Sequence, residues 1–324
     1  MRTCKKERFV LNRKRKRILF YSILIAFPSL QFLFFYIITN LNSFLLAFRV
    51  YKEAADHSYQ YTFGLFENIK TAFEVIMKNG DLVLNSLYLY LINLFIVSSL
   101  ALFFSYYIAK KYVLSGLFRV VLFLPTIISQ VVLVTLYKLI LNDAFVSLMT
   151  SLGLKDWLID KGLRQGLLNG PKNVQYACVL FFNVWISFGT NVLLYTGSMS
   201  GIDPSVIESA QLDGIGFLKA FIYIYLPLIW PTFVTFVVTG LTALFTSTMN
   251  LPSFYGVSQP PPFSVFGFFL YTQTMSSGLV SPFPGSVYNY SVLSSIGLII
   301  TLVMVPVTLS VKRLMEKYGP STEE

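Results

Sequence analysis

Charged residues are scarce in this sequence of 324 residues. Aspartate, glutamate, lysine and arginine together make up only 12% of it, about half of the share in an average soluble protein. A soluble chain of this length needs a charged surface in contact with water. Hydrophobic residues contribute 55% of the chain, and the mean hydropathy is +0.66. The composition therefore predicts a polytopic integral membrane protein.

Residues that bind metals or form nucleophile–base pairs are also rare. The sequence holds one histidine, His57, and two cysteines, Cys4 and Cys178. Their placement indicates neither a disulfide nor metal-ligand spacing. A single histidine also gives little support to a serine or cysteine triad. No Gly-x-x-x-x-Gly-Lys-Ser/Thr phosphate loop is present. We expect no metal, no cofactor and no catalytic residue in this chain.

The basic residues are concentrated at the N-terminus. Nine lysines and arginines precede Ile18, in a chain whose net charge is +10. This arrangement is typical of a segment, 1–17, that lies on anionic lipid headgroups at the cytoplasmic face. No second basic patch with interleaved aromatics supports nucleic-acid binding. The apolar run that follows continues to about Ile38 without a small-residue cleavage site, so we expect a retained helix rather than a signal peptide.

Six apolar runs are long enough to span a bilayer, which takes about 20 residues. The predicted spans are Ile18–Ile38, Leu82–Ala109, Val120–Leu141, Val174–Met199, Leu228–Met249 and Val292–Val311. The predicted fold is therefore an all-α membrane protein with six transmembrane helices. Segment 18–81 would hold the first helix and an outer loop, 82–311 a five-helix core, and 312–324 a C-terminal tail.

The distribution of positive charge predicts the orientation of these spans. With the N-terminus inside, 16 lysines and arginines fall on the inner side and 8 on the outer side. Inner loops carry the excess of positive charge in membrane proteins. We therefore expect both termini in the cytoplasm, which is consistent with an even number of spans.

The inner segment 201–227 has the pattern of a short capped helix. Asp203 is a suitable N-cap, and Pro204 suits the first helical position. Gly214 is placed to end the helix, and Val206, Ile207 and Ala210 would give it one apolar face. A helix this short is unstable alone, so it must pack on its own protein or on a partner.

The same segment resembles the EAA loop of bacterial ABC-importer permeases. The family pattern is Glu-Ala-Ala, three residues, Gly, nine residues, Ile, one residue, Leu-Pro. The matching residues here are Glu208, Ser209, Ala210, Gly214, Ile224, Leu226 and Pro227. Only Ser209 departs from the pattern, and serine, like the alanine it replaces, is small enough for close packing.

The resemblance extends over about 82–311 and is to the maltose and glycerol-phosphate type of carbohydrate permease. It rests further on Asn85-Ser86-Leu87, on Phe123-Leu124-Pro125, and on Asn183-Val184-Trp185 placed 25 residues before Glu208. One departure is that Leu251-Pro252 and the proline run 260–262 stand where such permeases often carry Gly-Gly-Pro. This departure weakens any inference about the substrate and the outer docking surface.

The resemblance implies a type I importer permease fold, in which 201–227 contains the coupling helix that docks on a separate ATPase. Asp203 would cap that helix, Glu208 would contact the ATPase, and Ala210 and Gly214 would permit close approach. The implied partners are a second permease, two ATP-binding subunits and an extracytoplasmic solute-binding protein. ATP would be bound by the partner ATPase and not by this chain. Without the resemblance, Glu208 would be an ordinary exposed charge.

Polar side chains in the predicted fourth span are candidates for a solute path. Asn183, Ser187, Thr190 and Asn191 recur at three- and four-residue intervals, which would place them on one helix face. Thr242, Thr246 and Ser247 are secondary candidates in the fifth span. All of these side chains could instead serve hydrogen bonding between helices.

Two alternatives to an importer subunit remain open from the sequence. An ion-coupled carrier would need charged residues at mid-membrane, and the spans contain essentially no acids. A membrane-embedded transferase would need acidic or histidine clusters at a membrane face. Asp203, Glu208 and Asp213 form the only acidic group on the inner side, and the EAA resemblance accounts for them.

Overall fold

The computed structural model describes residues 2–53, 59–64, 66–257, 261, 263–276 and 290–320, and most of them are helical. The chain divides into two compact units. The first comprises Met1–Glu74 and Tyr288–Ile299, and the second comprises Val75–Val287 and Ile300–Glu324. Five described helices are long and apolar enough to cross a membrane, and one bent helix pair gives a sixth. The prediction of a six-span helical membrane protein is confirmed.

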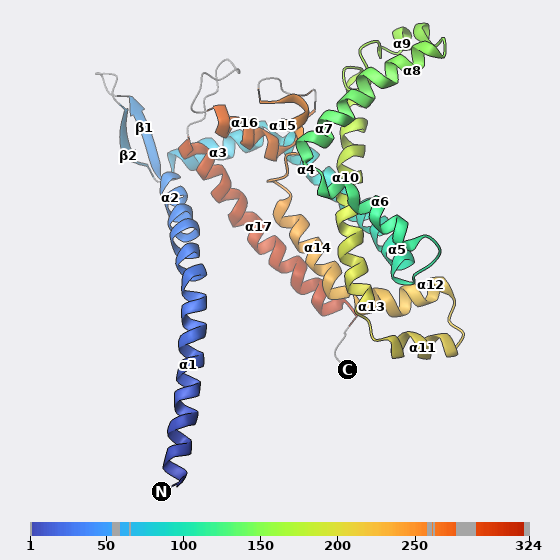
Figure 1. Ribbon diagram of the computed structural model, residues 1–324. Helices are drawn as coiled ribbons and strands as arrows, with labels where there is room; N and C mark the ends of the chain where they lie inside the picture. The colour runs from blue at the N-terminus through green and yellow to red at the C-terminus, as the bar shows by residue number, and fades with distance from the viewer. Residues whose placement is uncertain are drawn as a thin grey trace. The chain divides into compact units, whose positions relative to one another are not determined.

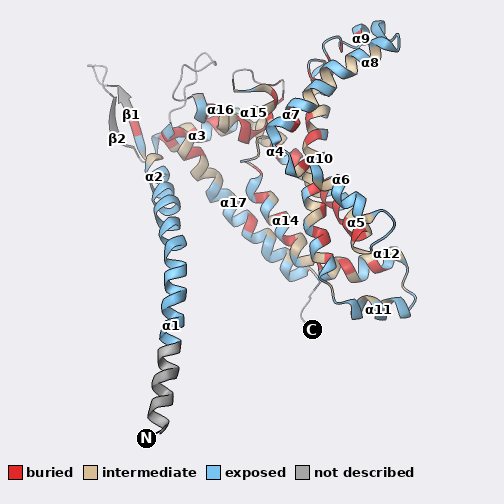
Figure 2. Ribbon diagram, viewed as in Figure 1, coloured by how far each residue is buried: buried red, intermediate tan, exposed pale blue. Residues whose placement is uncertain are grey.

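The first unit begins with one long helix. It consists of α1 (Arg2–Gln31), the π-helical η1 (Phe32–Ile38) and α2 (Thr39–Leu46). Its candidate span, Lys14–Leu46, has a mean hydropathy of 2.0, and none of the span's apolar window is buried. Figure 2 colours residues 14–31 of α1 as exposed. A helix that is apolar all round and not buried in protein requires lipid around it.

A hairpin follows that the sequence did not predict. β1 (Arg49–Glu53) pairs antiparallel with β2 (Tyr59–Phe63), in a register that places Arg49 opposite Phe63. Tyrosine, valine, threonine and phenylalanine supply most of these positions, and they favour strands. Asn68 of α3 (Glu67–Lys78) holds the turn before β1, because its Nδ2 donates to the carbonyl oxygens of Ala47 and Arg49 at 3.0 and 2.8 Å.

The second unit contains the remaining helices (Figure 1). A continuous 30-residue helix comprises α4 (Gly80–Ile92), the π-helical η2 (Asn93–Val97) and α5 (Ser98–Ala109); we call it helix 80–109. The elements after it are α6 (Ser115–Ile127), α7 (Gln130–Leu139), η3 (Ile140–Ala144), α8 (Phe145–Ser151), α9 (Lys155–Asp160), α10 (Lys172–Ser200), α11 (Pro204–Leu212), α12 (Phe217–Ala220), η4 (Phe221–Tyr225), α13 (Leu226–Leu228), α14 (Trp230–Ala243), α15 (Leu251–Tyr255), α16 (Phe266–Ser276) and α17 (Tyr290–Tyr318). Residues of α17 from Ile300 onward belong to this unit.

The third span differs from its predicted bounds. The apolar run Val120–Leu141 is not one helix, because α6 ends at Ile127 and α7 begins at Gln130. Ile128 and Ser129 are extended between them, with ψ values of 143° and 128°. The continuous apolar helix here is Gln130–Ser151. Apolar length alone did not reveal this break, since apolar residues continue on both sides of the Ser129-Gln130 pair.

The fifth span is bent rather than straight. Helical segments Phe217–Leu228 and Trp230–Ala243 meet at an angle of 69°. Pro227 and Pro231 flank the bend, and neither can donate a backbone hydrogen bond to the preceding turn. Helix α14 also ends at Ala243, short of the predicted Met249.

Several apolar clusters hold the second unit together, and two of them adjoin the segments discussed below. One surrounds the buried Phe182 of α10 and reaches α7 and α15. The other, which we call the Tyr106 cluster, joins α5, α10 and the segment 217–229. Its buried members are Ala101, Leu102, Tyr106, Ile108, Val192, Tyr195, Met199, Tyr225 and Ile229.

Candidate functional site

The short helix α11 has the two caps that the sequence predicted. Asp203 lies at the N-cap, where its Oδ1 accepts a hydrogen bond from the backbone N–H of Ser205 at 2.9 Å, and Pro204 follows at the first helical position. Hydrogen bonds from the backbone and side chain of Ser205 lower the pKa of the Asp203 carboxyl below its ordinary value. At the other end Gly214 adopts φ +72°, a left-handed conformation that disfavours any residue with a Cβ.

Most of the α11 surface is exposed. Glu208 and Ser209 are both exposed, and no residue of the helix is buried. Ile207 packs against the Tyr106 cluster, and Ala210 is half-buried. Val206, which was predicted to share their face, is instead 43% exposed, and Leu212 at the C-terminus is 89% exposed. The helix thus presents a carboxylate and two aliphatic side chains outward.

The rest of the predicted coupling segment lies against the helix bundle. Leu226 packs on the Tyr106 cluster, and Pro227 lies at the 69° bend that leads into α14. Trp230 continues this attachment, because its Nε1 donates to the carbonyl oxygen of Met315 in α17 at 3.0 Å. The exposed helix α11 is therefore followed by a segment that packs on the helix bundle.

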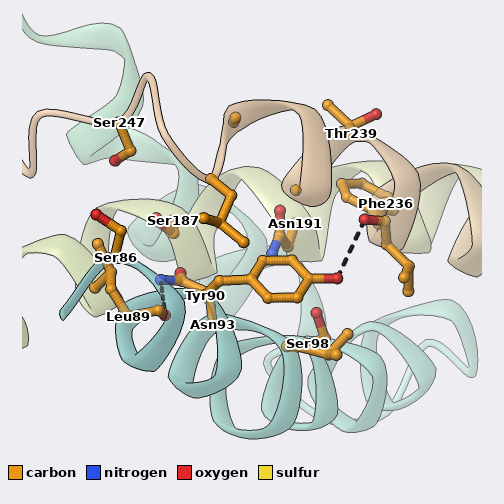
Figure 3. Close-up of a pocket in the computed structure, with 15 residues that line it drawn as sticks. Ser86, Leu89, Tyr90, Asn93, Ser98, Ser187, Asn191, Phe236, Thr239 and Ser247 are labelled. Atoms are coloured by element: carbon orange, nitrogen blue, oxygen red, sulfur yellow. Dashed lines mark hydrogen bonds between the residues drawn. The ribbon is translucent and has the colours of Figure 1, made fainter. Parts of the chain in front are cut away.

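A cavity of about 380 Å³ lies between helix 80–109, α10 and α14. Figure 3 shows the Tyr90 ring extending across it toward α14, where the hydroxyl donates to the carbonyl oxygen of Val237 at 3.3 Å. The polar lining consists of Ser86, Tyr90, Asn93, Ser98, Ser187, Asn191, Thr239 and Ser247. None of the fifteen lining residues is charged. Hydroxyl and amide groups beside aromatic rings can hydrogen-bond and stack on a neutral polar solute.

The structure divides the predicted path residues into two groups. Ser187 and Asn191 line the cavity, as does Ser247. Asn183 and Thr190 are not among the lining residues, and Thr190 is exposed. Thr242 and Thr246 are also absent from the lining, and their hydroxyls donate to the carbonyl oxygens of Thr239 and Ala243.

Asn183 instead joins a network of amide side chains, which we call the amide network. Its Nδ2 donates to the carbonyl oxygen of Met249 at 3.0 Å, and its Oδ1 accepts from the Nδ2 of Asn250 at 2.9 Å. Gln130, the first residue of α7, donates to the Oδ1 of Asn250. The network connects α10 to two places where helices are interrupted. This is the helix–helix hydrogen bonding that the sequence left open for Asn183.

The sequence reasoning missed the cavity residues of helix 80–109. Ser86, Tyr90 and Asn93 follow one another at intervals of four and three, and Ser98 lies farther along the same helix. This spacing is the signal that was used for the fourth span, so it could have identified these residues too.

Comparisons with known proteins reveal the relationship of the chain. No model of a known protein family matches it. It is 30% identical over 194 residues to the probable ABC transporter permease protein YurN of Bacillus subtilis, covering 59% of this chain and 61% of that protein. It is 27% identical to the arabinooligosaccharides transport system permease protein AraP of the same organism, covering 36% of each chain. The chain is thus similar to ABC transporter permeases. The matched part spans less than two thirds of either permease.

Solved structures extend the comparison to nearly the whole fold. A chain in the crystal structure of a bacterial ABC transporter involved in the import of the acidic polysaccharide alginate superposes with a TM-score of 0.68. The match covers 95% of this chain and 99% of that one, at 16% sequence identity. The permease fold that the EAA resemblance implied is therefore confirmed, and α11 occupies the segment in which the EAA pattern lies.

Proposed function

We propose that this chain is the transmembrane subunit of an ATP-driven importer and forms half of its solute pathway. Helix α11 would lie on the cytoplasmic side and dock on a separate ATP-hydrolysing subunit. The observation that carries the proposal is the exposure of α11, a helix capped at both ends that presents Glu208 outward within an EAA-type sequence. A nine-residue helix with so little burial gains from a protein partner.

The assembly would contain further chains. A single unit of this fold offers one wall of a pathway, so a second permease would complete it. Two ATPase subunits would bind on the α11 side, and an extracytoplasmic binding protein would deliver the solute from the other side. The cargo would be a sugar or oligosaccharide, because the cavity offers neutral hydroxyl and amide groups beside Tyr90 and Phe236. The absence of charged lining residues disfavours an ion-coupled carrier.

The test is purification of the chain from native membranes in mild detergent, with the co-purified proteins identified by mass spectrometry. We expect an ATPase and a second permease with the wild type, and loss of the ATPase with Glu208→Arg. The matched control is Glu316→Arg, which reverses another exposed carboxylate, one that forms only a surface ion pair with Lys312 at 3.7 Å. Purification of the wild-type chain without any ATPase in several detergents would contradict the proposal.

A further inference from the structure

Among the residues that attach the coupling segment to the bundle, Tyr106 of α5 contacts three of its rings. Its side chain is completely buried. The ring lies 4.7 Å from that of Phe217, 5.1 Å from that of Phe221 and 4.6 Å from that of Tyr225, measured between centroids. All three partners belong to α12 and η4, the elements directly after α11. Three rings from one segment thus enclose a single ring from helix 80–109.

Tyr106 also makes a directional contact with the same segment. Its hydroxyl donates to the carbonyl oxygen of Phe217, the first residue of α12, at 3.0 Å. A hydrogen bond inside an apolar cluster is strengthened by the low local dielectric, and it fixes one orientation of α12 on α5. Figure 1 shows α12 beside the end of α5. The apolar contacts alone would allow the segment to slide or rotate.

Helix 80–109 connects this attachment to the cavity. The helix is continuous from Gly80 to Ala109, and six of its residues line the cavity, Tyr90, Asn93 and Ser98 among them. Ser98 lies about 12 Å from Tyr106 along the axis and Tyr90 about 24 Å, at about 1.5 Å per residue. A displacement of α12 must therefore move a wall of the cavity or break the Tyr106 contacts.

From these contacts we infer that Tyr106 is the positioning residue that transmits movement of the coupling segment to helix 80–109, and so to the solute cavity. The inference rests on the proposed function, because it requires an ATPase that moves α11. The hydrogen bond of the hydroxyl fixes the orientation of α12 on α5, and the surrounding rings provide the apolar packing between them. Tyr106 touches neither solute nor nucleotide in this scheme.

Tyr107 provides a matched control within the same helix. Its hydroxyl also donates to a backbone carbonyl oxygen, that of Val113 at 2.8 Å. That acceptor lies in the turn between α5 and α6 and is not part of the coupling segment. Tyr106→Phe and Tyr107→Phe each remove one hydroxyl and one hydrogen bond, but only the Tyr106 bond ends on the coupling segment. Tyr106 is buried, whereas Tyr107 is half-buried.

The experiment follows the cavity directly and needs no identified solute. In the complex with its ATPase, with Cys4→Ser and Cys178→Ser as background, Asn93→Cys introduces a reporter thiol into the cavity wall. The measurement is the rate at which a membrane-impermeant maleimide labels this thiol, with and without a non-hydrolysable ATP analogue. We expect the nucleotide to change this rate in the wild type and in Tyr107→Phe. In Tyr106→Phe the nucleotide-dependent change in labelling rate should be about fivefold smaller, which is the effect of losing one neutral hydrogen bond. The ATPase should remain bound and active in this variant.

Three other results would contradict the inference, each for a different reason. A full nucleotide-dependent change in Tyr106→Phe overturns the transmitting role. Loss of the ATPase from Tyr106→Phe also overturns it, since Tyr106 would then only support the docking surface. If no ATPase co-purifies with the wild type, the proposed function fails and this inference fails with it.

Discussion

Thr190 and Asn191 are adjacent in the sequence but occupy different faces of α10. Asn191 lines the cavity, whereas Thr190 is exposed and is not among the lining residues. Both were candidates from spacing alone. If the cavity is the solute path, the amide of Asn191 can hydrogen-bond the solute and the Thr190 hydroxyl cannot.

Replacement of the two residues should therefore have unequal effects. We expect Asn191→Ala to raise the KM for sugar uptake by roughly threefold to tenfold, the effect of losing about one hydrogen bond. Thr190→Ala should leave KM unchanged. The measurement is uptake of a radiolabelled sugar in cells that express equal amounts of each variant. Equal effects of the two substitutions on KM would contradict the hypothesis that the cavity is the solute path.

At the scale of elements, the amide network holds together two interrupted helices. Gln130 begins α7 after the extended residues at 128–129. Asn250, with φ +58°, begins the turn into α15. Asn183 lies between them on α10 and bonds to both Met249 and Asn250. The network thus gives hydrogen-bond partners to polar groups at helix breaks, which would otherwise be costly within a membrane.

Removal of this network should destabilise the fold. We expect Asn183→Ala to lower the free energy of unfolding by about 1 kcal/mol, because two hydrogen bonds to Met249 and Asn250 are lost and such bonds contribute about 0.6 kcal/mol each on average in membrane proteins. Asn169→Ala is the control, since its side chain bonds only to the nearby Gln165 carbonyl. The midpoint of thermal unfolding in detergent distinguishes them. An unchanged midpoint for Asn183→Ala would show that the network does not stabilise these breaks.

Elements of this chain differ in how far the sequence could predict them. The spans and the caps of α11 follow from local information, namely apolar length, an Asp-Pro pair and a glycine. The break at Ile128 and the role of Asn183 depend on tertiary partners 50 or more residues away, which no local pattern contains. The cavity could be predicted only in part. The spacing of polar residues in helix 80–109 is apparent in the sequence, but the helices that pack around it are not.

At the scale of the whole molecule, α10 separates two groups of helical segments. Helix α9 and the end of the apolar helix Gln130–Ser151 precede its first residue, and α11 and α12 follow its last. The 29 residues of α10 extend about 43 Å, more than the roughly 30 Å of a bilayer core. The two groups must therefore lie on opposite sides of the membrane. The excess of positive charge predicts that α11 lies on the cytoplasmic side.

Cysteine labelling tests this orientation. In a background of Cys4→Ser and Cys178→Ser, a cysteine is introduced by Leu212→Cys in α11 or by Ile159→Cys in α9, at positions that are 89% and 52% exposed. A membrane-impermeant maleimide should label the α9 variant in intact spheroplasts, whereas the α11 variant should react only after permeabilisation, because lipid separates it from the reagent. The reverse pattern would place α11 outside the cell. An ATPase could not reach it there, so coupling through Glu208 and transmission through Tyr106 would both be excluded.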